Sequence, residues 1–269
     1  MKLKGGTKKV LITVKTYPNP STKYEETVCV AGIDLSTGKW IRLYPITYRD
    51  LDDNQKFKKY CIIEVNVKKA NNDHRPESYK VDTDSIKIIK CYDTKKGWKD
   101  RKQFILPAKS PSFCDILEQS IQHDVSLGMF KPHNINFEYK KAKPKDQIKR
   151  EAAYAKGRLF NKPKEPIETI PYDFRYDFYC LEKNDCPGHN LMIIDWEIGQ
   201  AYRKWRSLYP NESILMNKFK EKWINEFCSI DRDTYFIVGN TQRFRHKSFM
   251  VLGVFYPPLE KTSKNLRLF

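Results

Sequence analysis

Five short segments rich in β-branched and aromatic residues follow one another closely in the first ninety residues. They span residues 10–14, 26–33, 39–44, 61–67 and 86–89. Turn-forming clusters at residues 17–21 and 34–38 separate the first three segments. Strands this short and this closely spaced predict a small β-barrel or a strongly bent sheet.

From residue 112 onward the sequence pattern becomes mixed. It predicts a short helix at 113–121, a loop at 128–132 and strands at 134–139 and 174–179. The strongest helix pattern covers 192–208, where Leu191, Ile194, Ile198 and Tyr202 recur at helical spacing. A second helix is expected at 217–227 and strands at 234–239 and 249–256. The last strand is a long apolar run, so we expect it to be central in its sheet.

Charge and proline content divide the chain into three parts. Residues 1–139 are predicted to form a β-rich nucleic-acid-binding module, and residues 169–269 an α/β module. Residues 140–168 carry many lysines and arginines together with three prolines, which indicates a basic linker or arm. This segment is either a solvated loop or an arm that contacts phosphates.

The excess of basic residues indicates a polyanionic partner. Fifty Lys and Arg against 33 Asp and Glu give a formal charge of +17. Nucleic acid is favoured over a membrane surface because no apolar run approaches the ~18 residues of a membrane span. As the partner we expect DNA in preference to RNA. The N-terminus has no signal-peptide pattern, so we expect a cytoplasmic protein. The alternative is a lysine-rich surface that only maintains solubility. The oligomeric state is not predicted.

The seven cysteines are expected to be reduced thiols, mostly buried. Cys180, Cys186 and His189 lie within ten residues around a Pro-Gly turn, and such sulfur and nitrogen ligands suit zinc. A fourth ligand is expected from His246 or Cys228, and a site with four protein ligands would be structural. The alternative is two buried cysteines beside a turn histidine.

Two carboxylates, Asp195 and Glu197, occur at the expected start of the long helix. The helix dipole favours acidic residues there, which is a sufficient explanation by itself. The functional alternative makes one of them a general base or a metal ligand. Because they are two residues apart on a helix, they would not both serve one site.

Residues 239–248, between the last two strands, combine cations with hydrogen-bonding side chains. Arg243, Arg245 and Lys247 alternate and could meet phosphates, while Asn240, Gln242 and His246 could contact a base edge or a sugar. The alternative is a polar hairpin loop.

A third candidate surface lies on the segment 39–44. Trp40, Arg42 and Tyr44 share one face by strand alternation and could form a stacking platform for bases. In the alternative interpretation, the two rings belong to the core. The predicted nucleic-acid contacts are Trp40, Arg42, Tyr44, Lys140, Lys141, Lys143, Lys145, Arg243, Arg245 and Lys247.

Two segments carry a resemblance to known protein classes. Residues 28–33 followed by 38–43 resemble OB-fold-like nucleic-acid modules of uncharacterised prokaryotic proteins. The Cys/His turn with residues 195–197, and the ending at 255–258, are similar to small proteins of mobile and phage-defence genes. This resemblance implies a protein acting in DNA-directed bacterial defence or repair. It transfers no catalytic residue. The strand and helix patterns predict an α+β protein, with a small OB- or PUA-like barrel before the α/β module.

These observations lead to one functional hypothesis with two rivals. No phosphate-binding glycine loop, dinucleotide fingerprint or nucleophile elbow occurs in the sequence. We predict a hydrolase acting on DNA, a glycosylase or nuclease, that removes or cuts near a flipped base. Its catalytic residues would come from Asp195, Glu197, Asn240 and His246. The rivals are a non-enzymatic nucleic-acid-binding protein with a structural zinc, and an RNA-binding or RNA-modifying factor.

Overall fold

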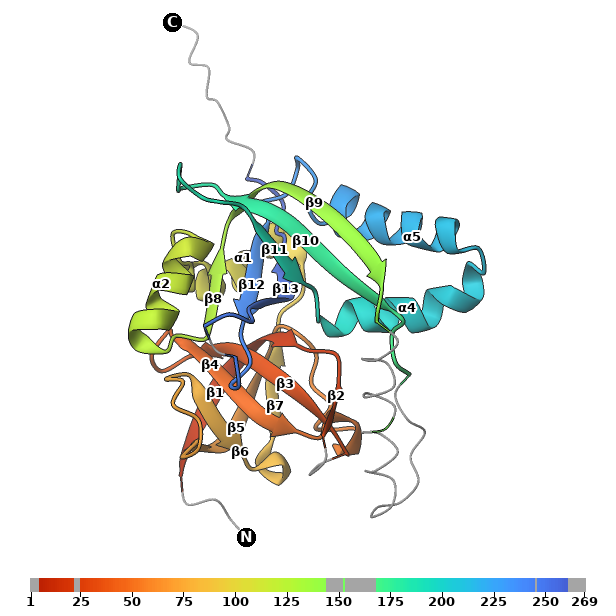
Figure 1. The fold of residues 1–269 in the computed structure, drawn as a ribbon. Coiled ribbons are helices and arrows are strands. Elements are labelled where there is room, and N and C mark those ends of the chain that lie inside the picture. Colours follow the sequence, from red (N-terminus) through yellow and green to blue (C-terminus); the bar gives the residue numbers. More distant parts are fainter. Residues whose placement is uncertain (1–4, 22–24, 144–151, 153–167, 245, 261–269) are drawn as a thin grey trace, which may run out of the picture.

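Five strands close into a β-barrel in the N-terminal part of the chain (Figure 1). The computed structural model describes residues 5–21, 25–143, 152, 168–244 and 246–260. The barrel strands are β1 (Gly6–Lys15), β3 (Glu25–Asp34), β4 (Trp40–Ile46), β5 (Cys61–Lys69) and β6 (Ser78–Val81). The order around the ring is β1-β3-β4-β6-β5 and back to β1, antiparallel except for the parallel pair β4–β6. The predicted barrel is therefore confirmed.

Two further strands and two short turns complete this part of the chain. Strand β2 (Asn19–Ser21) pairs with β3, and β7 (Lys87–Cys91) pairs with β5. The 3-10 turns are η1 (Tyr48–Asp50) and η2 (Thr83–Ser85).

Alternation along β4 separates the inside of the barrel from its outer face. Ile41 and Leu43 belong to the apolar core inside the barrel, whereas the intervening Arg42 lies on the outer face. Strand packing is tight at Gly32, where a Cβ would lie 2.2 Å from the carbonyl oxygen of Leu11. The β1–β3 contact therefore requires glycine at this position.

The C-terminal part consists of two three-stranded antiparallel sheets with helices packed around them (Figure 1). One sheet has the order β13-β12-β8, and the other β11-β10-β9. The strands are β8 (Leu127–Phe130), β9 (Pro132–Lys141), β10 (Tyr172–Cys180), β11 (His189–Met192), β12 (Tyr235–Gly239) and β13 (Met250–Phe255). The helical elements are α1 (Lys95–Ile105), η3 (Leu106–Ala108), α2 (Phe113–His123), α4 (Trp196–Leu208), α5 (Glu212–Lys220) and the π-helical turn η4 (Glu221–Glu226).

Several predicted elements differ from those observed. The expected loop at 128–132 contains β8, and β13 is an edge strand of its sheet rather than a central one. The long helix begins at Trp196 instead of residue 192 because Asp195 caps it and residues 189–192 form β11. The expected second helix is instead α5 followed by η4, and α1 was not predicted.

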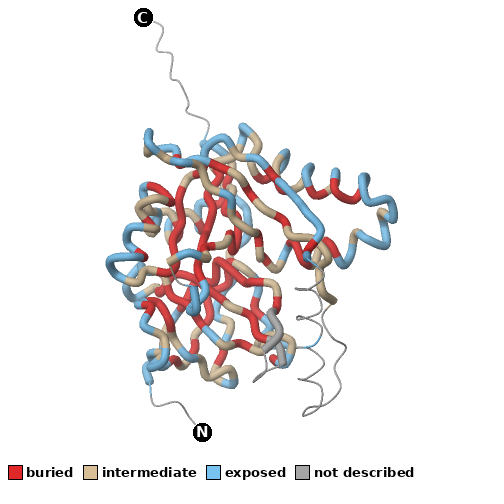
Figure 2. The backbone as a smooth tube through the Cα atoms, viewed as in Figure 1, coloured by how far each residue is buried: buried red, intermediate tan, exposed pale blue. Residues whose placement is uncertain are grey.

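The predicted division of the chain at residue 139 falls inside β9. That strand pairs with β10, and β8 pairs with β12, so residues 127–141 belong to the C-terminal sheets. The barrel and the C-terminal part are also held together by a shared apolar core. Leu11 and Ala31 from the barrel pack there with Trp98, Met129 and other residues of α1, β8, β12 and β13. Figure 2 shows this buried material running continuously between the two parts.

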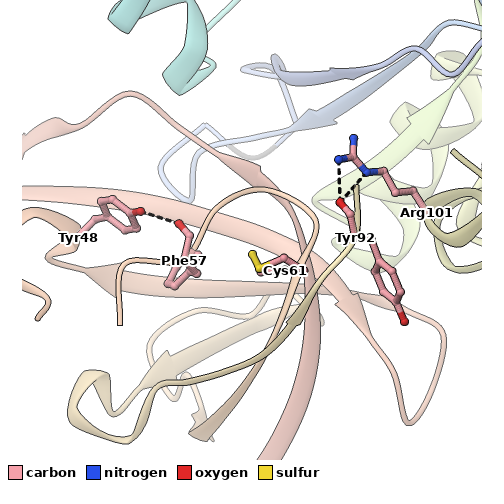
Figure 3. The surroundings of a disulfide bond; sticks show 6 residues. Tyr48, Phe57, Cys61, Tyr92 and Arg101 are labelled. Carbon is pink, nitrogen blue, oxygen red and sulfur yellow. Dashed lines mark hydrogen bonds between the residues drawn. A yellow bond between two sulfur atoms is a disulfide. The ribbon is translucent and has the colours of Figure 1, made fainter. Parts of the chain in front are cut away.

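One disulfide bond links neighbouring strands of the barrel region. Cys61 of β5 and Cys91 of β7 face each other in register, and their sulfur atoms are bonded (Figure 3). The expectation that all seven cysteines are reduced is thus wrong for this pair, because sequence spacing does not reveal cross-strand neighbours. The other five cysteines are free. Within the described ranges, no helix has the length and apolar character needed to cross a membrane.

Candidate functional site

Three cysteines and a histidine converge at one end of the sheet that contains β10 and β11. Cys180 ends β10, Cys186 lies in the following turn and His189 begins β11. The fourth member is Cys114 in the first turn of α2, which Ser112 caps by accepting a hydrogen bond from the Asp115 backbone N–H. The four ligand atoms lie within 4.8 Å of one another, so this cluster could hold a metal ion.

The distances within the Cys3His cluster match tetrahedral coordination. Metal–sulfur bonds of about 2.3 Å and metal–nitrogen bonds of about 2.0 Å require about 3.8 Å between sulfurs and about 3.5 Å between sulfur and nitrogen. The Cys114 and Cys180 sulfurs are 3.8 Å apart. His189 Nε2 lies 3.4, 3.7 and 3.2 Å from the sulfurs of Cys114, Cys180 and Cys186, respectively.

The surroundings of the cluster are consistent with a closed metal site. The His189 ring packs edge-on against Phe113, with centroids 4.7 Å apart, and burial lowers its pKa, which favours the neutral, ligating imidazole. Burial and the neighbouring Cys180 raise the pKa of Cys114 to about 12 without a cation. A divalent cation would supply the charge that stabilises the thiolates.

Both residues proposed as the fourth ligand lie elsewhere. The Cys228 thiol donates to the backbone oxygen of Trp223 at 3.4 Å, and His246 Nε2 lies 3.7 Å from an oxygen of Asp124. The predicted ligands Cys180, Cys186 and His189 do converge, but their partner comes from α2.

A cavity of about 210 Å³ lies between the outer face of the barrel and the β13-β12-β8 sheet; we call it the Arg42 pocket. β3 and β4 contribute one wall, the β5–β6 loop contributes Arg75, and the C-terminal part contributes the opposite wall. Its lining consists of Thr16, Cys29, Arg42, Tyr44, Arg75, Ile194, Asn240, Thr241, Gln242, Met250 and Leu252.

Buried hydrogen bonds fix the Arg42 guanidinium at this pocket. Arg42 is only 4% exposed, and its Nη2 donates to the carbonyl oxygen of Ser126 at 2.9 Å and to the hydroxyl at 3.1 Å. Its Nη1 lies 3.1 Å from the Cys29 sulfur. Ser126 is held in turn by Glu77, which accepts from its N–H and its hydroxyl. Among the described residues, Arg42 has no direct ion pair and its Nε–H has no acceptor.

A second arginine of the pocket is held from the loop between β5 and β6. Arg75 is 5% exposed and forms an ion pair with Asp73 at 2.6 Å. Its Nη1 donates to the backbone oxygen of Asn240 at 2.8 Å and reaches the side-chain oxygen at 3.3 Å. The guanidinium group also lowers the pKa of Asp73 to about 2, against the effect of burial. Arg75 therefore joins the barrel to the end of β12.

The predicted catalytic residues do not share one site. Asn240 lines the Arg42 pocket, whereas the Asp195 carboxylate, 3% exposed, accepts from Lys59 at 2.8 Å. Glu197 lies 3.3 Å from the same Lys59 ammonium, so both carboxylates form ion pairs with this one lysine. Burial raises the pKa of Asp195 to about 6, while Lys59 works in the opposite direction. His246 is near Asp124, as described above.

The predicted nucleic-acid contacts lie in different environments. Trp40 is half-buried and donates to the backbone oxygen of Ala108, whereas Tyr44 is 43% exposed at the Arg42 pocket. The remaining described residues of the set are exposed: Lys140, Lys141, Lys143, Arg243 and Lys247. Lys145 and Arg245 lie outside the described residues, as does most of the predicted arm.

Sequence reasoning missed four residues that build these sites. Cys114 was not assigned because it lies 66 residues before Cys180. Arg75, Glu77 and Ser126 were not predicted to be site residues either. The sequence Arg75-Pro76-Glu77 offered a signal, because two opposite charges flank a proline in a loop between predicted strands. Only the fold shows that these charges are buried.

Two family models match the chain, and they meet between α1 and α2. Residues 6–107 match the family described as Domain of unknown function (DUF8758). Residues 108–269 match Domain of unknown function (DUF8757). The second match covers more than half of the chain, so the protein belongs to the DUF8757 family. No curated protein compared with the chain matches it.

Proposed function

We propose that this protein binds nucleic acid, with DNA as its partner, and holds one unstacked base in the Arg42 pocket. The observation that carries the proposal is the presence of two buried guanidinium groups, Arg42 and Arg75, at one cavity. Amide groups of Asn240 and Gln242 accompany them. Arginine and amide side chains are the groups that pair with the acceptor and donor edges of bases.

The position of the pocket on the barrel supports the same function. We interpret the ring order, in which β4 and β6 are the parallel pair, as the arrangement expected for an OB-fold. Such barrels bind oligonucleotides on the face of their second and third strands and on the loop between the fourth and fifth. In this chain those elements are β3, β4 and the loop that carries Arg75, and all three line the Arg42 pocket.

The charge of the chain supplies the nonspecific part of the affinity. A formal charge of +17 attracts phosphate backbones, and exposed cations such as Arg243 and Lys247 lie in the loop after β12, which also contributes Thr241 and Gln242 to the pocket. Tyr44, 43% exposed, offers a ring on which a neighbouring base could stack.

We further propose that the Cys3His cluster holds a structural zinc ion. Four protein ligands leave no open coordination position for substrate, which is typical of a structural site. The ion would fix α2 against β10 and β11. The segment after α2 carries Ser126, the residue that anchors Arg42, so the metal would support the pocket through the length of α2.

The geometry favours binding over base excision. Excision requires a carboxylate near the glycosidic carbon of the bound base. The Asp195 carboxylate is ion-paired with Lys59, and Asp195 is not among the described residues that line the Arg42 pocket. The hydrolase therefore remains a prediction from the sequence.

The proposal is tested by fluorescence anisotropy with labelled single-stranded and duplex DNA and RNA at low ionic strength. We expect Arg42→Met and Gln242→Ala each to weaken DNA binding about tenfold or more. Arg203→Met is the matched control, since it removes an exposed arginine of α4 outside the pocket. Circular dichroism and melting temperature establish that each variant is folded.

Three results would overturn the proposal. The first is the absence of oligonucleotide binding, and the second is wild-type affinity in both pocket variants. The third is release of free base or strand cleavage that Asp195→Asn abolishes while binding persists, which would establish the enzyme instead. Tighter binding of RNA than of DNA would change the partner.

A further inference from the structure

A second cavity, of about 380 Å³, shares no lining residue with the Arg42 pocket. It lies where the end of β1, the segment before β5, the start of α1 and the start of α4 meet. We call it the Lys15 pocket. Its lining consists of Lys15, Lys58, Lys59, Tyr60, Thr94, Trp98, Arg101, Trp196, Glu197, Val254 and Tyr256.

Cations outnumber carboxylates around this cavity. Lys15, Lys58, Lys59 and Arg101 line it together with a single acidic residue, Glu197. Glu197 and the adjacent Asp195 are both paired with Lys59. Among the described residues, Lys15, Lys58 and Arg101 form no ion pair, so the walls carry unneutralised positive charge.

Lys15 is the most unusual of these cations. Only 8% of the residue is exposed, and its ammonium lies 3.8 Å from the ring centroid of Tyr48 and 4.5 Å from that of Trp196. The two aromatic faces hold the ammonium toward the pocket. Burial and the nearby Lys59 lower its pKa to about 8, against the opposite effect of Glu197 and Asp195.

Arg101 presents a further donor to the same space. Its Nε and Nη2 donate to the backbone oxygen of Tyr92 at 3.1 and 2.7 Å, as Figure 3 shows. The guanidinium lies 3.9 Å from the ring centroid of Tyr60. These contacts orient the group, while Nη1 has no partner among the described residues.

The backbone around the pocket is strained. Tyr60 and Trp98 both line the cavity and have φ of 65° and 64°, and Lys96 has φ of 49°. For residues with a Cβ, this left-handed conformation costs roughly 1–2 kcal/mol each. Strain of this kind persists where the surrounding structure enforces it, and it concentrates at ligand sites. The Cys61–Cys91 disulfide joins the strands next to Tyr60 and Tyr92.

We infer that the Lys15 pocket binds the phosphate group of a nucleotide. Lys15, Lys58 and the free edge of Arg101 would meet the phosphate oxygens, which prefer such charge-assisted donors. The rings of Trp98, Trp196 and Tyr256 would contact the sugar or base. The phosphate could belong to a free mononucleotide or to the end of an oligonucleotide. The inference does not depend on the Arg42 pocket.

The test compares ligands that differ only in the phosphate. Calorimetry or thermal-shift titration of the full chain uses a nucleoside 5′-monophosphate, the matching nucleoside and inorganic phosphate. We expect the monophosphate to bind at least tenfold more tightly than the nucleoside. Lys15→Met and Lys58→Gln should each remove at least tenfold of that affinity, whereas the exposed control Lys87→Gln, which lines neither pocket, should not.

Oligonucleotides with a 5′-phosphate or a 5′-hydroxyl distinguish the two sources. A preference for the phosphorylated strand that Lys15→Met abolishes identifies a nucleic-acid end as the ligand. Binding of the mononucleotide without that preference identifies a free nucleotide. The inference fails if no phosphorylated ligand binds better than its unphosphorylated counterpart. It also fails if both variants, shown to be folded by their melting curves, bind like the wild type.

Discussion

Replacement of Cys114 by serine tests the Cys3His cluster most directly. Cys114 is the member contributed by α2, while the other three belong to the β10–β11 hairpin. The substitution removes one sulfur at 3.8 Å from the Cys180 sulfur and 3.4 Å from His189 Nε2. The metal would then have three ligands, all from one hairpin, and would no longer tie α2 to the sheet.

The expected size of the effect follows from linkage. A metal present at about 1,000 times its dissociation constant stabilises the folded state by about 4 kcal/mol. Since a chain of this length shifts its melting temperature by roughly 2–4 °C per kcal/mol, Cys114→Ser should lower it by on the order of 10 °C. Treatment of the wild type with a chelator should produce a similar decrease, and added chelator should not affect the variant further.

The assay combines metal analysis of the purified protein with thermal unfolding. The wild type should hold about one zinc ion per chain. Cys228→Ser is the matched control, because this free, half-buried cysteine lies outside the cluster and should retain both metal and most of the stability. The reasoning is refuted if the wild type remains metal-free after incubation with zinc. Equal metal content and melting temperature in Cys114→Ser would refute it as well.

Three further predictions concern charge and packing. The pKa of Lys15 is lowered from 10.5 to about 8, so the cost of burying the ammonium is fully present below pH 8 and disappears as the pH rises toward 10.5. That lowering corresponds to a destabilisation of roughly 3 kcal/mol, which the favourable contacts of the ammonium with the aromatic rings reduce. Lys15→Met should therefore raise the unfolding free energy by about 1–3 kcal/mol at pH 7 and by much less at pH 10. A pH-independent difference between variant and wild type in urea titrations would contradict this. Gly32→Ala places a Cβ 2.2 Å from the Leu11 carbonyl oxygen and should cost about 2 kcal/mol or more, whereas Gly6→Ala, with nothing within 4 Å, should cost much less in the same titrations. DNA affinity should fall about tenfold or more between ~50 and ~200 mM salt in anisotropy titrations, and a flat salt dependence would exclude phosphate contacts as its source.

The local pattern of the sequence was sufficient to predict most elements of the barrel. The β-branched runs and the turns between them correspond to observed strands, and Arg42 and Tyr44, predicted to share a face, both line the Arg42 pocket. The three ligands of the Cys/His turn could also be predicted, because they are near one another along the chain. Element boundaries were less certain: β8 is only four residues long and contains Gly128, so its sequence looked like a loop.

Contacts between distant segments were decided only by the tertiary structure. Cys114 reaches the Cys/His turn because α2 packs beside the end of β10, and Cys61 meets Cys91 because β5 and β7 pair. The sequence left Asp195 as either a first-turn acidic residue favoured by the helix dipole or a candidate general base, and the structure makes it the helix cap and the partner of Lys59. Neighbours along the chain were enough to predict the first three barrel strands with their turns and the grouping of Cys180, Cys186 and His189, since these features are local. Which charges are buried, paired or turned toward a cavity depends on segments up to 165 residues apart, such as Arg75 and Asn240, and only the packing of the barrel against the C-terminal sheets decided it.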